Sequence, residues 1–166
     1  MKPIWDANGI TFDGVNDFLQ TDPFTLNQPE FIYAVVKLLS YAAGRVLMDG
    51  INSASAFVMQ YDNGWLGYSV GGYINLGYNL PLAVGSLGII RLSPNGSSTK
   101  IITNGNAPVT GVGSNVAMGG ITLGNRHNLG GAFANMLVKE YICRSIADNS
   151  TDEAEIYNYL KTKYGL

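Results

Sequence analysis

Charged residues are scarce in this sequence. Ten Lys and Arg and twelve Asp and Glu make 13% of the 166 residues charged, about half of the roughly 25% typical of globular domains. Glutamate, a helix former, occurs four times, whereas the turn-favouring Gly and Asn occur 21 and 16 times. This composition excludes a helical bundle, a coiled coil and most α/β enzymes. Because 46% of the residues are hydrophobic, it also excludes a disordered chain.

Cysteine, clustered basic residues and long apolar runs are also rare or missing. Cys143 is the sole cysteine, so no internal disulfide can form. Lys and Arg are scattered and the net charge is −2, which argues against a nucleic-acid partner. No apolar run reaches the roughly 20 residues of a membrane span, and residues 1–6 lack the apolar stretch of a signal peptide. The length fits a single domain over residues 1–166.

Many short apolar runs, separated by Gly and Asn, cover most of the chain. Eleven or twelve such runs at close spacing are typical of an all-β sandwich or barrel. Residues 106–117 are the most loop-like stretch. The strands that we expect are 10–12, 18–20, 31–39, 45–49, 56–61, 65–70, 73–76, 87–92, 99–103, 121–123 and 135–144.

The end of the chain changes from strand to helix periodicity. Residues 151–164 carry an apolar stripe at four-residue spacing, formed by Ile156, Leu160 and Tyr164. Ser150 and Glu153 have the spacing of a capping box, and a glycine at 165 is suited to ending the helix. We therefore expect one C-terminal α-helix over about 151–164.

A β-hairpin is predicted around the Asn-Gly dipeptide at 63–64, the strongest short hairpin signal. A two-residue turn pairs Tyr61 with Leu66, and their alternate neighbours, which include Phe57, then form an apolar core face with them. This register places Trp65 on the opposite, polar face beside Gln60. A slip of one residue would exchange the two faces of a strand.

Both ends of the chain resemble a known family. The segments are Phe12–Leu19 near the start, then Ile121–Asn125, Val138–Ile142 and Asp152–Gly165. They are similar to the opening hairpin, the penultimate strand, the closing strand and the terminal helix of concanavalin A-like lectin/glucanase (laminin-G-like) jelly-roll domains. The resemblance implies two antiparallel sheets in a curved sandwich, with the first and last strands as neighbours. Short domains of this type are familiar from bacteriophage structural and tail-associated proteins.

Candidate catalytic residues are few in this sequence. Glycosidases need two carboxylates across the scissile bond, and the Glu-x-Asp-x-(x)-Glu arrangement of the family's glucanases is missing. His127 is the only histidine and is expected to be an exposed loop residue, while Cys143 is expected to be a small packed residue. One His and one Cys are too few for a zinc site. A glycoside hydrolase is thus a remote alternative.

Two groups of residues are candidates for carbohydrate binding, which uses aromatic faces and hydrogen-bonding side chains in a concave site. The first is Trp65 with Gln60, Tyr73 and Tyr78, and the second is the loop pair Arg126 and His127. Any single aromatic residue is nevertheless more often packed in a core or an interface than used for a ligand.

Calcium is a possible cofactor, because lectin-like and laminin-G-like domains often bind it through loop oxygens. Asp13, Asn16 and Asp17 offer such oxygens. One short turn does not by itself make a calcium shell, and Asp and Asn are common in turns for backbone reasons. We therefore favour turn chemistry for these three residues and expect no metal or other cofactor.

The sequence thus favours a non-enzymatic, lectin-like carbohydrate-binding or adhesion module, located in a phage virion or tail or otherwise at a cell surface or outside the cell. The alternative is a virion assembly or decoration domain that acts through protein contacts without a sugar ligand. A low-charge, Tyr-rich surface resembles an interface, so a homo-oligomer is expected in either case. The expected partners are a cell-surface glycan or other virion proteins.

Overall fold

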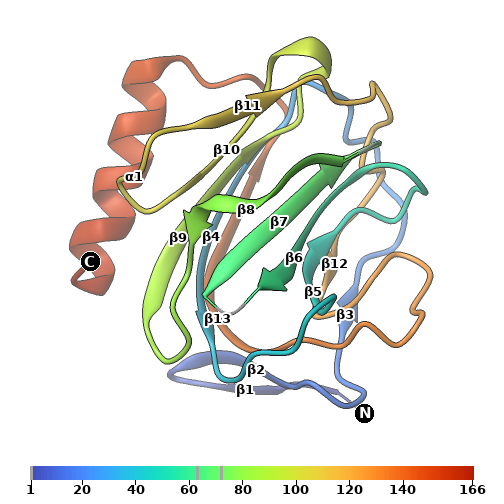
Figure 1. Cartoon of the computed structure of the whole chain (residues 1–166), viewed down its shortest axis with the longest axis vertical. Coiled ribbons are helices and arrows are strands. Elements are labelled where there is room, and N and C mark those ends of the chain that lie inside the picture. The colour runs from blue at the N-terminus through green and yellow to red at the C-terminus, as the bar shows by residue number, and fades with distance from the viewer. Residues whose placement is uncertain (1, 63, 72) are drawn as a thin grey trace.

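Two antiparallel sheets form the body of the protein (Figure 1). The computed structural model describes residues 2–62, 64–71 and 73–166, with the backbone alone for residues 62 and 73–79. The seven-stranded sheet has the order β1 (Ile4–Asp6), β2 (Gly9–Asp13), β13 (Asn135–Arg144), β4 (Phe31–Leu38), β9 (Leu87–Ser93), β10 (Thr99–Thr103) and β11 (Val109–Gly111). The six-stranded sheet has the order β3 (Leu19–Gln20), β12 (Thr122–Leu123), β5 (Val46–Asp49), β6 (Ala56–Asp62), β7 (Trp65–Val70) and β8 (Tyr73–Pro81).

This architecture confirms the predicted all-β, two-sheet antiparallel jelly roll with one C-terminal α-helix. The opening strand β2 pairs directly with the closing strand β13, as the family resemblance implied. Two edge strands are not marked by the sequence pattern: β1 pairs with β2, and β11 lies within the loop-like stretch 106–117. Both are three residues long, so they carry too few residues to show a period.

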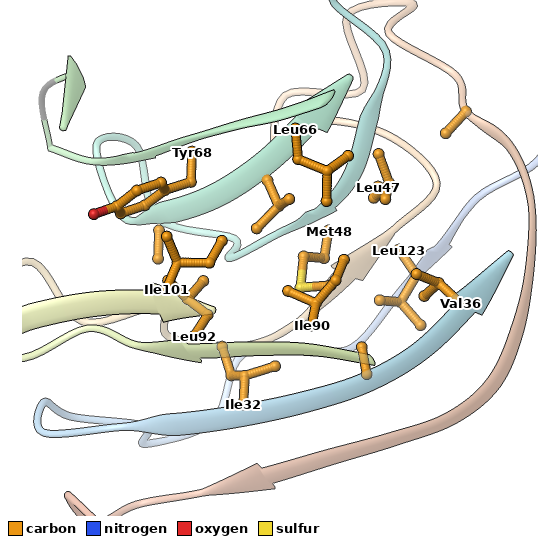
Figure 2. Packing of buried hydrophobic residues seen from close by; sticks show 14 of the residues in the cluster. Ile32, Val36, Leu47, Met48, Leu66, Tyr68, Ile90, Leu92, Ile101 and Leu123 are labelled. Carbon is orange, nitrogen blue, oxygen red and sulfur yellow. The ribbon is translucent and has the colours of Figure 1, made fainter. Parts of the chain in front are cut away.

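The main core lies between the two sheets. Figure 2 shows Leu66 and Tyr68 of the six-stranded sheet on one side of this core and Ile90 and Leu92 of β9 on the other. All four side chains are at most 1% exposed. Burying these large apolar groups is the main source of stability of such a sandwich.

A second apolar cluster attaches the helix α1 (Ser150–Tyr164) to the outer face of the seven-stranded sheet (Figure 1). Leu160 is fully buried against Phe31, Tyr33 and Val35 of β4. The predicted stripe is therefore the docking face of the helix. One sheet is covered by α1 on its outer side, and no helix covers the outer side of the other within the described chain.

The cap of this helix differs from the predicted capping box. Asn149, not Ser150, is the N-cap, and its Oδ1 accepts hydrogen bonds from the backbone N–H groups of Thr151 and Asp152. Glu153 turns away from the cap and binds Arg91 and a lysine of the sheet. Gly165 ends the helix in the left-handed conformation, as expected.

The predicted hairpin forms, but the predicted register of β6 differs from the observed one by one residue. Asp62 pairs with Trp65 across the turn as expected, whereas Gln60 instead of Tyr61 pairs with Leu66. A bulge at Tyr61 accommodates the extra residue. The bulge exchanges the faces of β6, so Gln60 points into the core and Phe57 points outward.

Candidate functional site

The candidate site lies on the outer face of the six-stranded sheet. Asp49 of β5 pairs with Phe57 of β6, which pairs with Ser69 of β7, so the three form one row across the sheet. Their side chains point away from the sandwich core, because their neighbours on each strand point into it. These core-facing neighbours are Met48, Val58 and Tyr68.

A loop between β12 and β13 covers one end of this row. The backbone N–H of His127 donates to Asp49 Oδ2 at 2.8 Å, and His127 Nδ1 lies 3.1 Å from the same oxygen. Burial raises the pKa of the Asp49 carboxyl, and the hydrogen bonds from His127 lower it in part. Asp49 therefore anchors the loop to the sheet.

The loop has its own internal support. The buried side chain of Asn125 accepts hydrogen bonds from the N–H groups of Arg126 and Ala132. Gly124 has φ +81°, and a Cβ atom there would come within 2.5 Å of the Phe12 ring, so only glycine fits. The loop is thus held at both ends in one conformation.

Arg126 and Phe57 form the centre of the site. The Arg126 guanidinium carbon lies 4.9 Å from the centroid of the Phe57 ring, within the range of a cation–π contact. Arg126 Nε is buried and has no hydrogen-bond partner in the described part of the chain. The pocket has a volume of about 290 Å³ and is lined by Asp49, Ser53, Ala54, Ser55, Phe57, Ser69, Gly71, Arg126 and His127.

The pocket offers the chemistry that a polyhydroxylated ligand requires. Arg126 supplies N–H donors, Ser53 adds an exposed hydroxyl group, and Phe57 provides an apolar ring. Concave sites with apolar surface and a few directed polar groups are typical of specific small-ligand binding.

The predicted pair Arg126 and His127 lines this pocket. His127 was expected to be an exposed loop residue, and this is wrong: its side chain is 18% exposed because it rests on Asp49. Asp49, Phe57 and Ser69 were missed. The predicted register of β6 places Phe57 in the core. Asp49 follows three buried apolar residues, and no sequence motif distinguishes it as a site residue.

The predicted group around Trp65, with Gln60, Tyr73 and Tyr78, is not assembled as expected. Trp65 lies on the outer face of β7 and is 37% exposed, on the same face as Ser69 and roughly 13 Å along the strand. Gln60 is 1% exposed, so its predicted place beside Trp65 is wrong. Its amide instead accepts from the N–H of Ala42 at 2.8 Å and donates to the carbonyl of Ser40.

Tyr73 and Tyr78 belong to β8, and their side chains lie outside the described residues. The backbone of Tyr73 pairs with Ser69, which extends the row of the site by one strand.

The predicted calcium residues form a hydrogen-bonded turn. Asp13 Oδ1 accepts from the N–H groups of Val15, Asn16 and Asp17, and these bonds lower the pKa of Asp13. Asp17 Oδ2 accepts in turn from the N–H of Asp13. Among the described residues, no group of three or more His, Cys, Asp or Glu side chains could hold a metal ion.

Three of the four glutamates have structural partners. Glu30 is fully buried and accepts from the N–H of Met118, and Glu140 binds Lys163. Glu153 binds two cations of the sheet, and Glu155 is exposed on the helix. None of the four lines the Arg126 pocket. Cys143 is partly buried, and burial raises its pKa to about 12, so it is a weak nucleophile.

No helix in the described chain has the length and apolar character to cross a membrane. The sequence matches no protein-family model and no curated protein.

Solved structures with the same fold were found. A Trypanosoma rangeli sialidase in complex with sialic acid has a TM-score of 0.72 and 15% identity, over 95% of this chain and 28% of the sialidase chain. Domains LG4-5 of the mouse laminin α1 chain have a TM-score of 0.59 and 14% identity, over 87% of this chain and 44% of that chain. The binding domain of botulinum neurotoxin DC, in complex with SialylT, has a TM-score of 0.55 and 11% identity, over 86% and 39%.

The chain therefore spans less than a third of the sialidase and less than half of the other two chains. At these identities the likeness concerns the fold. Three observations indicate the same fold. They are the strand order of the two sheets, the pairing of the opening strand with the closing strand, and the likeness to the laminin domains. The fold of this chain is that of the concanavalin A-like, laminin-G-like jelly roll.

Proposed function

We propose that this chain is a non-enzymatic, lectin-like module that binds a glycan on the outer face of its six-stranded sheet. One observation carries the proposal: the Arg126 guanidinium is held over the Phe57 ring, in a pocket that a firmly anchored loop completes. Two of the proteins with the same fold were solved with sialic acid or a sialyl ligand, which supports a glycan as the ligand class. Trp65 extends the binding face along β7.

A glycan array, followed by titration of the best ligand, tests this proposal. Arg126→Gln and Trp65→Ala should each weaken binding about tenfold or more and leave the melting temperature unchanged, because both side chains are partly exposed. Tyr159→Ala is the control, since Tyr159 is an exposed aromatic residue on α1, which packs on the other sheet. A blank array for the wild type, or unchanged affinity in both variants, would refute the proposal.

The second candidate function is assembly through protein contacts. Trp5 and Ile4 are 82% and 66% exposed on β1, at the edge of the seven-stranded sheet, where backbone groups are free to pair with another strand. If β1 is an oligomer interface, light scattering will show a defined oligomer that Trp5→Ala dissociates. Trp65→Ala will leave that oligomer intact. A wild-type monomer at high concentration would contradict this candidate.

We extend the first candidate to a phage virion or tail as the location, with a cell surface or extracellular location as the alternative. The scarcity of charge and the single cysteine support a particle component assembled in a reducing compartment. Morphogenesis genes beside the coding gene would agree with a virion, and metabolic genes there would contradict it.

A further inference from the structure

A polar groove lies at one end of the sandwich, where the loops before β4, around the 3₁₀ turn η1 (Gly96–Ser98) and between β11 and β12 meet near the top of Figure 1. It consists of two hollows of about 430 and 410 Å³, each within the range of small-molecule sites. Both hollows are lined by Asn27 and Ala117, so they adjoin. We call residues 23–29, 52, 95–97, 115, 117 and 119 the end groove.

The lining of the end groove carries no charged side chain. Its polar groups are mainly amides, of which those of Asn27, Asn95 and Asn115 make no hydrogen bond within the described part of the chain. Each amide can both donate and accept, as a sugar hydroxyl does. Phe24, which is 43% exposed, adds an apolar ring at the other hollow. A charged ligand would find no counter-ion there, whereas a neutral polyol would find matched partners.

The groove is preorganised by Gln28. Its Nε2 donates to the carbonyl groups of Ser114 and Val116, and its Oε1 accepts from the N–H of Gly96 at 3.0 Å. One side chain thus joins the three loops. Gly96 has φ +48°, a left-handed conformation that glycine adopts without strain. Binding to loops that are already fixed costs little conformational entropy.

We propose that the end groove binds a neutral oligosaccharide, with adjacent sugar units in the two hollows. The Asn amides bond the hydroxyl groups of one unit, and the Phe24 ring packs against the apolar face of the next. This site is separate from the Arg126 pocket, because the two share no lining residue. The chain would then hold a glycan at two places.

The test is an NMR titration of the full chain with four neutral hexasaccharides (cellohexaose, maltohexaose, mannohexaose and chitohexaose) and with hexagalacturonate as the charged probe. At least one neutral hexasaccharide should shift amide signals of residues 23–29, 95–97 and 115–119, and hexagalacturonate should leave them unchanged. Failure of all four neutral probes, equal shifts with hexagalacturonate, or shifts confined to other residues would overturn the proposal.

Variants then identify the groups that bind. The double variant Asn27→Ala/Asn115→Ala removes two exposed amides without internal partners, so the fold should be kept and affinity should fall about tenfold or more. Asn158→Ala, on the exposed side of α1, is the matched control. Arg126→Gln should leave the end-groove shifts unchanged, which separates a failure of this site from a failure of the Arg126 pocket. Wild-type affinity in the double variant would contradict the proposed contacts.

Discussion

At the residue scale, Gln60 shows why the residues of the candidate pocket were only partly predicted. A polar residue in an alternating strand is normally assigned to the solvent face. Here its side-chain amide and its backbone form hydrogen bonds with the turn at residues 40–45, at Ala42, Gly44 and Arg45. The bulge at Tyr61 that turns Gln60 inward has no mark in the local sequence, so the outward position of Phe57 could not be predicted either.

Glu30 is a second buried polar residue, and it lends itself to a test. Its Oε1 accepts from Met118 N at 3.1 Å, whereas its Oε2 is buried without a partner in the described chain. Burial raises the pKa of Glu30 to about 7, above the value of 4.5 expected for the unfolded chain. The nearby Tyr141 and Cys143 also have raised pKa values and stay neutral below pH 8.

The folded state therefore favours protonated Glu30. The preference for the protonated carboxyl stabilises the folded protein fully below about pH 4.5. This stabilisation is lost as the pH rises through about 7, where the buried carboxyl group becomes charged. Glu30→Gln keeps the acceptor but removes the charge. We expect the variant to differ least from the wild type at pH 5 and to be more stable at pH 8, by up to about 3 kcal/mol.

Urea denaturation of both proteins at micromolar concentration, at pH 5 and pH 8, measures this difference. A constant difference between the two proteins at both pH values would show that Glu30 does not titrate in this range.

At the element scale, the C-terminal helix was the best predicted part of the chain. Its apolar stripe has the period of a helix, and its end is marked by a glycine. Only the cap was wrong, because Glu153 makes ion pairs with Arg91 at 2.9 Å and with Lys100 at 2.5 Å. These tertiary contacts compete with the local capping box, and a single segment of sequence contains no information about them.

The docking of α1 depends on Leu160. Leu160→Ala should lower the free energy of unfolding by about 2–5 kcal/mol, since this side chain is fully buried between the helix and β4. Glu155→Ala, on the exposed side of the helix, should change it by less than about 0.5 kcal/mol. Thermal or urea unfolding followed by circular dichroism measures both. Equal stability of the two variants would mean that the helix does not stabilise the sheet.

At the scale of the whole molecule, the composition predicted the class of fold, and the resemblance at the two chain ends predicted the topology. Strands with five or more residues and clear periods were found near their expected places. The sites were harder to predict, because each combines strands and loops that are distant in sequence. The Arg126 pocket joins residues 49, 57, 69 and 126, which only the sheet order brings together.

The low charge of the molecule also has a measurable consequence. A net charge of −2 at pH 7 gives weak mutual repulsion, and near the sequence pI of 5.2 even that is lost. We expect self-association of the wild type at high concentration to rise steadily as the pH falls from 8 to 5. Static light scattering against pH measures this effect, and a flat second virial coefficient over that range would contradict it.

The anchored loop between β12 and β13 divides its residues into two kinds. Asn125 and His127 hold the loop on the sheet, whereas Asn128, Leu129 and Gly130 are exposed at its tip. Exposed tips on a fixed base tolerate substitution and insertion. The tip is therefore the place where new side chains could be displayed beside the Arg126 pocket without disturbing the sandwich, which makes it the natural starting point for altering the glycan binding that we propose for this pocket.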